Sequence, residues 1–320
     1  MKEEVFIVTG GFFDGSSEGY IGKVILMKGE EDVSLRFETS MITEPPTPAL
    51  RVKNKGFAGG SVHKNLLWLC SPNQVLAYSL PDLELKQVID DDLFNDLHYV
   101  LAEDDGLYIV NTGLESLDHF GYDGALKERK LLTSDERTVQ RTTSHPEFRV
   151  IESKPHFMHA NYCFRRDDGR LLLTFVRQRR IVNTSDWSWA SSEYSAPIHD
   201  GFIARYSPIG KDCLWVTTVP GEVIASNPKN YEVVKKWVLN ENDVPPGWTR
   251  GLCILEHGFL VGTTKIRASN AKYHTGWTQS DIENSRSTIS YIPFNHHHRT
   301  VVLDVLNERN SKIFSILPLE

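Results

Sequence analysis

Residues 98–110 read HYVLAEDDGLYIV, and this stretch decides the fold because its plan recurs along the chain. It contains a strand-like run, a tight Asp-Asp-Gly turn and a more apolar second run, which is the pattern of a β-hairpin. The same plan occurs in HANYCFRRDDGRLLL at 159–173, in HDGFIARYSPIGKDCLWV at 199–216 and in RGLCILEHGFLV at 250–261. A fifth copy, FAGGSVHKNLLWLC, occupies 57–70. Short strands repeated in this way predict a sandwich, a barrel or a propeller.

The sequence that follows three of the copies repeats as well. In each case the apolar strand ends in small polar residues, and a third strand, a turn and a polar outer strand come next. A copy and its continuation form a four-stranded unit of roughly 40–50 residues, which is the size of a propeller blade. We therefore predict an all-β fold, a single β-propeller domain that spans residues 1–320.

Six blades are the best count, with five and seven left open. The predicted blades span 5–40, 51–92, 96–133, 155–188, 198–241 and 249–319. The run VFIVTGGF near the N-terminus resembles a second strand, so the innermost strand of the first blade is expected from elsewhere in the chain. The C-terminal run TVVLDVLNERNSKIFSILPL could close the ring in either of two registers.

Composition and charge exclude several classes of protein. A net charge of −7 argues against a nucleic-acid surface, which needs a clustered basic face. No apolar stretch reaches the length of about 18 residues that spans a membrane, and the N-terminus does not read as a secretory signal. These features predict a cytoplasmic protein that binds neither nucleic acid nor membrane, and they leave the oligomeric state open. Four cysteines without a CxxC motif are predicted to be buried free thiols: Cys70, Cys163, Cys213 and Cys253.

Four large nitrogen-bearing side chains begin consecutive innermost strands. They are His98, His159, His199 and Arg250. The innermost strands of a propeller start at one face and line the axial channel, so these side chains are predicted to meet at the axial mouth. His159 lies ten residues before the glycine of its turn, against eight for His98 and Arg250, so a higher position or a bulge is expected there.

Three histidines at equivalent positions favour a metal site. Neutral imidazole is the commonest metal ligand, and three histidines with an open position form a catalytic arrangement. We therefore predict that His98, His159 and His199 hold a divalent metal ion and act in catalysis. Arg250 cannot ligate a metal, and its guanidinium suits a carboxylate or phosphate on a substrate.

Neighbouring residues complete the predicted substrate site. Asn161 and Asp200 lie beside the histidines and could orient them, and Trp248 shares the side of its strand with Arg250. Thr112 and Thr217 end second strands at the same face. Two long connections, 183–198 and 266–298, are expected to form an aromatic lid over the mouth with Trp187, Trp189, Tyr194, Tyr273, Trp277 and Tyr291.

The repeat plan resembles the six-bladed propeller superfamily of TolB, NHL and SMP-30-like proteins over nearly the whole chain. The sequence is most similar to members with D-x-H, H-x-N, H-D-G and R-G-L elements, which here are Asp96–His98, His159–Asn161, His199–Gly201 and Arg250–Leu252. The acidic calcium ligands of an SMP-30-like lactonase are not evident, so the resemblance does not imply lactonase chemistry.

Two functions from different classes follow from these residues. The first is a metal-dependent enzyme acting on a small polar or anionic substrate at the axial mouth, as a lyase, epimerase, hydrolase or oxygenase. The second is a propeller that binds a protein or glycan without catalysis.

Overall fold

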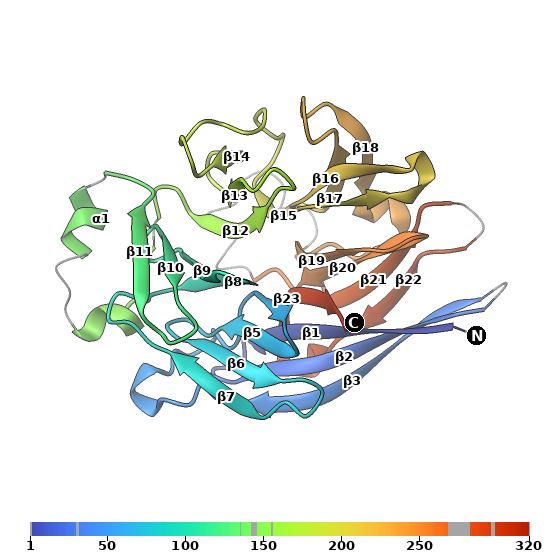
Figure 1. Cartoon of the computed structure of the whole chain (residues 1–320). Helices are drawn as coiled ribbons and strands as arrows, with labels where there is room; N and C mark the ends of the chain where they lie inside the picture. The colour runs from blue at the N-terminus through green and yellow to red at the C-terminus, as the bar shows by residue number, and fades with distance from the viewer. Residues whose placement is uncertain are drawn as a thin grey trace.

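The protein, described by a computed structural model, is a ring of six β-sheets (Figure 1). The structure describes residues 2–29, 32–134, 136–141, 146–154, 156–267, 282–295 and 298–319. Within these ranges the helices are limited to α1 (Glu136–Arg141) and five short 3-10 turns. No helix of these residues is long and apolar enough to cross a membrane.

Each sheet is an antiparallel blade, and the predicted six-bladed propeller is confirmed. Blade one is formed by β23 (Ser311–Pro318), β1 (Lys2–Phe12), β2 (Gly19–Lys28) and β3 (Val33–Thr43). Blade two contains β4 (Gly60–His63), β5 (Leu66–Cys70), β6 (Val75–Ser79) and β7 (Leu85–Ile89). Blade three contains β8 (Leu97–Glu103), β9 (Gly106–Asn111), β10 (Ser116–Phe120) and β11 (Leu126–Leu131).

The other three blades follow in chain order. Blade four has three strands, β12 (Ala160–Arg165), β13 (Leu171–Phe175) and β14 (Arg180–Asn183), and an isolated bridge joins Val182 to Trp189 where a fourth strand would lie. Blade five contains β15 (Ile198–Tyr206), β16 (Lys211–Thr218), β17 (Glu222–Ser226) and β18 (Val233–Val238). Blade six contains β19 (Trp248–Ile254), β20 (Gly258–Thr264), β21 (Thr288–Pro293) and β22 (Val301–Asp304).

The last strand of the chain closes the ring. β23 pairs with β1 and so supplies the innermost strand of the first blade, while β22 stays in blade six. Figure 1 shows this strand beside the N-terminal strands. Gly10 permits the close approach, because a Cβ atom there would lie 1.9 Å from the carbonyl oxygen of Lys312. The expectation that β1 is a second strand is confirmed.

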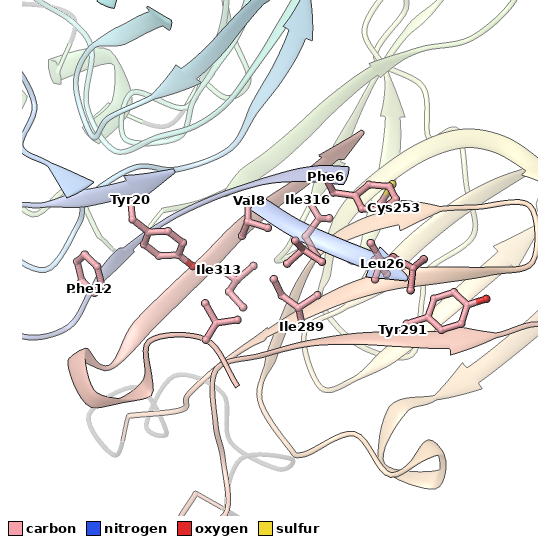
Figure 2. Close-up of a cluster of buried hydrophobic side chains, with 13 residues drawn as sticks. Phe6, Val8, Phe12, Tyr20, Leu26, Cys253, Ile289, Tyr291, Ile313 and Ile316 are labelled. Carbon is pink, nitrogen blue, oxygen red and sulfur yellow. The ribbon is translucent and has the colours of Figure 1, made fainter. Parts of the chain in front are cut away.

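Apolar side chains hold each blade against its neighbours. The described residues contain six buried clusters, and each one joins two adjacent blades. Figure 2 shows the cluster at the ring closure, where Ile313 and Ile316 of β23 lie among side chains such as Val8 and Ile289. All four cysteines are buried and free, as predicted, and each of them belongs to one of these clusters.

The innermost strands surround the axis. They are β23, β4, β8, β12, β15 and β19, and each one contacts the next around the ring. Their first residues therefore come together at one face, although they are far apart in sequence.

Candidate functional site

Irregular backbone marks the start of four innermost strands. The pairing of β8, β12, β15 and β19 with the second strand of each blade shifts register near its beginning. Each shift leaves one or two residues without a partner in the second strand. These residues are His98, Asn161, His199 with Asp200, and Gly251. Bulges change the direction of side chains and are common next to active sites. The expectation of a bulge in the strand that follows His159 is confirmed.

Left-handed backbone occurs at the same places. Asp96 has φ 46°, His159 has φ 56° and Gly251 has φ 74°. A left-handed conformation costs a residue with a side chain free energy, and such residues gather at functional sites. Asp96 and His159 share this conformation with turn residues elsewhere in the described chain, but they adopt it at the starts of two adjacent innermost strands.

Asp96 and His98 form the centre of a polar cluster. Lys55 Nζ donates a hydrogen bond to Asp96 Oδ1 over 2.6 Å, and His98 Nε2 lies 3.7 Å from Asp96 Oδ2. His98 Nδ1 lies 2.5 Å from Asn161 Oδ1, on the other side of the ring. Asp96 Oδ2 itself is buried and has no hydrogen-bond partner among the described residues. This carboxylate oxygen therefore lies beside two imidazole nitrogens, His98 Nε2 at 3.7 Å and His156 Nε2 at 3.9 Å, both beyond hydrogen-bond distance.

The charges of this cluster follow from burial and neighbouring groups. Burial favours the neutral carboxyl of Asp96, but Lys55 and His98 overcome it and hold its pKa well below 3.8. Burial lowers the pKa of His98, because it disfavours the imidazolium more than Asp96 favours it. Burial, with His98 and His156 nearby, holds the pKa of His159 well below 6.5. Asp96 is therefore ionised at neutral pH, and both imidazoles are neutral.

Arg250 lies at the same mouth between aromatic rings. Its guanidinium carbon is 4.2 Å from the ring centre of Phe314 and 5.4 Å from that of Trp248. Its Nε atom is buried without a hydrogen-bond partner, and no carboxylate in the described part of the chain forms an ion pair with it. Burial lowers its pKa to about 10, against the opposing effect of Asp200 and Asp96, so it remains a cation at neutral pH.

Asp200 is a buried acid beside this arginine. Its backbone nitrogen donates to Thr217 Oγ1 over 3.0 Å, and the Thr217 hydroxyl donates to Asp200 Oδ2 over 2.8 Å. Burial raises the pKa of Asp200 to about 6, although Thr217 and Arg250 favour its charged form. Thr217 therefore orients Asp200. The contacts of Thr217 and Asp200 with a substrate stay predictions.

Thr112 joins two blades in this structure. Its hydroxyl is buried and donates to the backbone carbonyl of Ala160 over 2.6 Å, so it joins blade three to blade four. This bond occupies the donor of the Thr112 hydroxyl, and the contact of Thr112 with a substrate stays a prediction. His199 and Trp248 do lie together, with ring centres 6.3 Å apart at 82°.

The three predicted metal ligands are not arranged as a metal site. His98 and His159 are neighbours with ring centres 5.2 Å apart, whereas His199 packs against Trp248. Within the described ranges, no group of three His, Cys, Asp or Glu side chains could hold a metal ion. His98, His159 and His199 thus do not fit a divalent ion in this conformation.

The predicted aromatic lid is only partly present in the described residues. Tyr291 belongs to β21 and is fully buried in the cluster of Figure 2, so its assignment to the lid is wrong. Trp187 and Trp189 are exposed and line a groove between blades three and four. Tyr273 and Trp277 lie outside the described residues.

Comparison with known proteins identifies the architecture. No family model and no curated protein matches the sequence. A protein of unknown function from Bacteroides caccae has a TM-score of 0.61 at 9% identity, with 99% of each chain covered. A chain of a nidogen/laminin complex has a TM-score of 0.58 at 9% identity, with 98% of this chain and 97% of that chain covered. A protein from Lactobacillus plantarum has a TM-score of 0.50 at 12% identity, with coverage of 99% and 82%.

The chain is a six-bladed β-propeller. At these identities the likeness shows the fold alone, so membership in one family of the TolB, NHL and SMP-30-like superfamily stays a prediction. The fold alone does not fix a function, which depends on the chemistry of the site.

Sequence reasoning missed several groups at the mouth of the propeller. His156 Nδ1 lies 3.1 Å from His159 Nδ1, and His156 Nε2 lies 2.8 Å from Ser153 Oγ. These residues belong to a connection between blades, and only the short interval from His156 to His159 could have pointed to them. Lys55 and Lys312 were missed because one precedes a blade and the other lies in the strand that closes the ring.

Proposed function

We propose that this propeller is an enzyme that acts on a small hydroxylated anion at its axial mouth. The observation that carries the proposal is Arg250, a guanidinium whose Nε atom is buried without a partner, which lies against Phe314 and Trp248 and forms no ion pair with a described carboxylate. A buried charge is costly unless an opposite charge and hydrogen bonds compensate it. Aromatic faces attract the cation but accept none of its hydrogen bonds in the plane of the guanidinium. A carboxylate or phosphate of a ligand supplies both the opposite charge and the hydrogen-bond acceptors in the guanidinium plane.

The second ligand group is a proton donor. Neutral His98 carries its proton on Nδ1 when that atom donates to Asn161 Oδ1, which leaves Nε2 as an acceptor; this tautomer is inferred from the hydrogen bond. Nε2 and the vacant Oδ2 of Asp96 lie 3.7 Å apart, which is longer than a hydrogen bond. A ligand hydroxyl between them would donate to one of these acceptors.

The chemistry that follows is proton transfer. A neutral imidazole beside an ionised carboxylate can accept a proton from a bound hydroxyl or from the carbon next to it. Asp96 would then stabilise the imidazolium of His98 that forms, because the two groups are already adjacent. These steps are shared by lyases, epimerases and hydrolases, and analysis of the product distinguishes the three.

Substitution of Arg250 tests the anion site. We expect Arg250→Gln to lower the affinity for small hydroxycarboxylates by about 10- to 100-fold, because a charge-assisted hydrogen bond contributes about 1.5–3 kcal/mol. Arg250→Lys should retain part of the affinity, since it keeps the charge but loses the planar fork. Titration calorimetry with a panel of such acids provides the measurement, and Arg36→Gln on the exposed strand β3 is the matched control.

Two results would contradict this assignment. One is an Arg250→Lys variant that loses about 3–5 kcal/mol of stability, the usual effect of breaking a buried pair, while its ligand affinity stays unchanged. The other is binding without turnover of any acid that binds, which would instead support the alternative of a non-catalytic propeller.

Metal dependence remains a separate prediction. It requires His98, His159 and His199 to move together from the arrangement seen here, so no step above uses a metal. If the prediction is correct, protein purified without an affinity tag contains about one equivalent of a divalent metal by elemental analysis, and His159→Ala lowers this content or the metal affinity by about 10-fold or more. Unchanged metal content in His159→Ala, or no metal at all after incubation with divalent ions, contradicts it.

A further inference from the structure

Basic side chains and aromatic rings alternate across the top of blades six and one. Arg250 lies 4.2 Å from the ring centre of Phe314, and Lys312 Nζ lies 5.8 Å from the same centre. Lys312 Nζ also lies 4.6 Å from the ring centre of Phe13. The guanidinium carbon of Arg267 lies 3.9 Å from the ring centre of Phe13. We call these five side chains the cation–aromatic row. It runs from the axial mouth at Arg250 to a second guanidinium at Arg267.

Lys312, in the middle of the row, has hydrogen-bond partners within the protein. Lys312 Nζ donates to the backbone carbonyls of Asn54 and Lys55 over 2.7 Å and 2.5 Å. Burial, together with Lys55, Arg250 and Arg267, holds the pKa of Lys312 well below its usual range. Lys312 is therefore a structural link, and the row has no need of a ligand at this position.

The two ends of the row share a different property. The Nε atoms of Arg250 and Arg267 are both buried without a hydrogen-bond partner. Neither guanidinium forms an ion pair with any carboxylate that the structure describes, and burial lowers the pKa of Arg267 as it does that of Arg250. Two partly buried guanidinium groups, each with a buried Nε that has no partner and neither with a counter-ion among the described residues, indicate two positions for anions.

A cavity is present at the outer end. Its volume is about 470 Å³, which lies within the usual range of small-molecule sites, and Arg267, Lys265 and Phe13 contribute to its lining. Lys265 Nζ lies 3.4 Å from Asn310 Oδ1 on the same wall. Glu283 also lines the cavity and opposes the binding of an anion there, although it is not paired with Arg267. The wall therefore carries two cations and one carboxylate.

We propose that the ligand carries two separate anionic groups, one bound by Arg250 at the axial mouth and the other by Arg267 and Lys265 in the outer cavity. This inference rests on the proposed anion site at Arg250 and extends it to a dianionic substrate class, such as a dicarboxylate or a phosphorylated carboxylate. The aromatic rings of Phe314 and Phe13 would lie along the apolar part of such a molecule.

A series of straight-chain dicarboxylates and monocarboxylates tests the inference by calorimetry. We expect one dicarboxylate length to bind at least about tenfold more tightly than the monocarboxylate of equal length, since a second charge-assisted contact adds at least about 1.4 kcal/mol. Arg267→Gln should abolish this difference and leave monocarboxylate affinity unchanged. Arg250→Gln should weaken the binding of both series. Glu283→Gln should strengthen dicarboxylate binding only, because it removes a like charge.

The outcomes separate this inference from the proposed function. If Arg267→Gln leaves the dicarboxylate preference intact, or lowers both series equally, the second anion position is refuted and the site at Arg250 stands. If Arg250→Gln changes the affinity of neither series, or if no member of either series binds, the proposed function fails and the inference fails with it. Circular dichroism and urea unfolding of each variant establish that it is folded.

Discussion

At the scale of single residues, this site depends on side chains whose backbone departs from regular β-structure. Asp96 and His159 are left-handed, and His98 and Asp200 are passed over by the register of their strands. A regular strand would send alternate side chains to opposite faces of the sheet. The bulges instead direct neighbouring polar groups toward one axis, and burial there changes their pKa values in opposite directions.

The raised pKa of Asp200 makes the free energy of unfolding depend on pH in a predictable direction. Its carboxyl ionises near 3.8 in the unfolded chain and near a pKa of about 6 in the fold, so the folded protein binds more protons between these pH values. The contribution of Asp200 to the free energy of unfolding therefore falls as pH rises from about 4 to about 6, and it stays low above that range. At about 1.4 kcal/mol for each pH unit, the loss is about 3 kcal/mol.

Asp200→Asn removes this dependence. We expect the free energy of unfolding of the variant, relative to that of the wild type, to rise by about 2–3 kcal/mol between pH 4 and pH 7. Urea unfolding at both pH values measures it, and His98 and His159, whose own contributions rise with pH, cancel in the comparison. Asp212→Asn, on the exposed start of β16, should show no such rise. Parallel pH profiles for wild type and Asp200→Asn would refute the assignment.

At the scale of elements, threonine hydroxyls join adjacent blades. Thr9, Thr112, Thr174 and Thr264 each donate to a backbone carbonyl at or just before the innermost strand of the next blade. The acceptors are the carbonyls of Ala58, Ala160, His199 and Ile313. These bonds hold the strand starts that carry the site, which explains why threonine recurs at the ends of second strands.

Thr112→Val tests this role, because it keeps the shape of the side chain and removes its donor. The carbonyl of Ala160 then loses a buried partner, and we expect the free energy of unfolding to fall by about 1–3 kcal/mol. Thr112→Ser retains the hydroxyl and should lose less. Equal stability of the two variants by urea unfolding, or a loss of ligand affinity in Thr112→Val without loss of stability, would instead favour the predicted contact with a substrate.

At the scale of the whole molecule, closure of the ring completes the site. β23 brings Lys312 and Phe314 to the mouth beside Arg250, which comes from blade six, and Lys55, which lies between blades one and two. The apolar cluster of Figure 2 stabilises this closure, because Ile313 and Ile316 are buried between the first and last blades. The same strand therefore supports both the ring and the cation–aromatic row.

The sequence by itself determined the blades and part of the site. Local patterns set them: an apolar strand, a turn such as Asp104–Gly106 and a second strand recur within a few residues, and hairpin pairing is local. The six-bladed count and the strand starts at His98, His199 and Arg250 followed from this repetition. The proximity of His98, His159 and Asn161 followed as well, since equivalent positions in adjacent blades lie side by side.

Only the tertiary structure decided which other side chains lie at the site and which partners they have. Lys55 and His156 lie in connections, where no repeat fixes their direction, and the register of Lys312 depends on pairing with β1 at the far end of the chain. The partner of the Thr112 hydroxyl is a carbonyl of the next blade. The ring that His199 packs against, Trp248, also comes from the next blade. A repeat in sequence fixes how strands pair within a blade, whereas the partners of a polar side chain at the axis come from other blades and depend on bulges that the repeat does not encode.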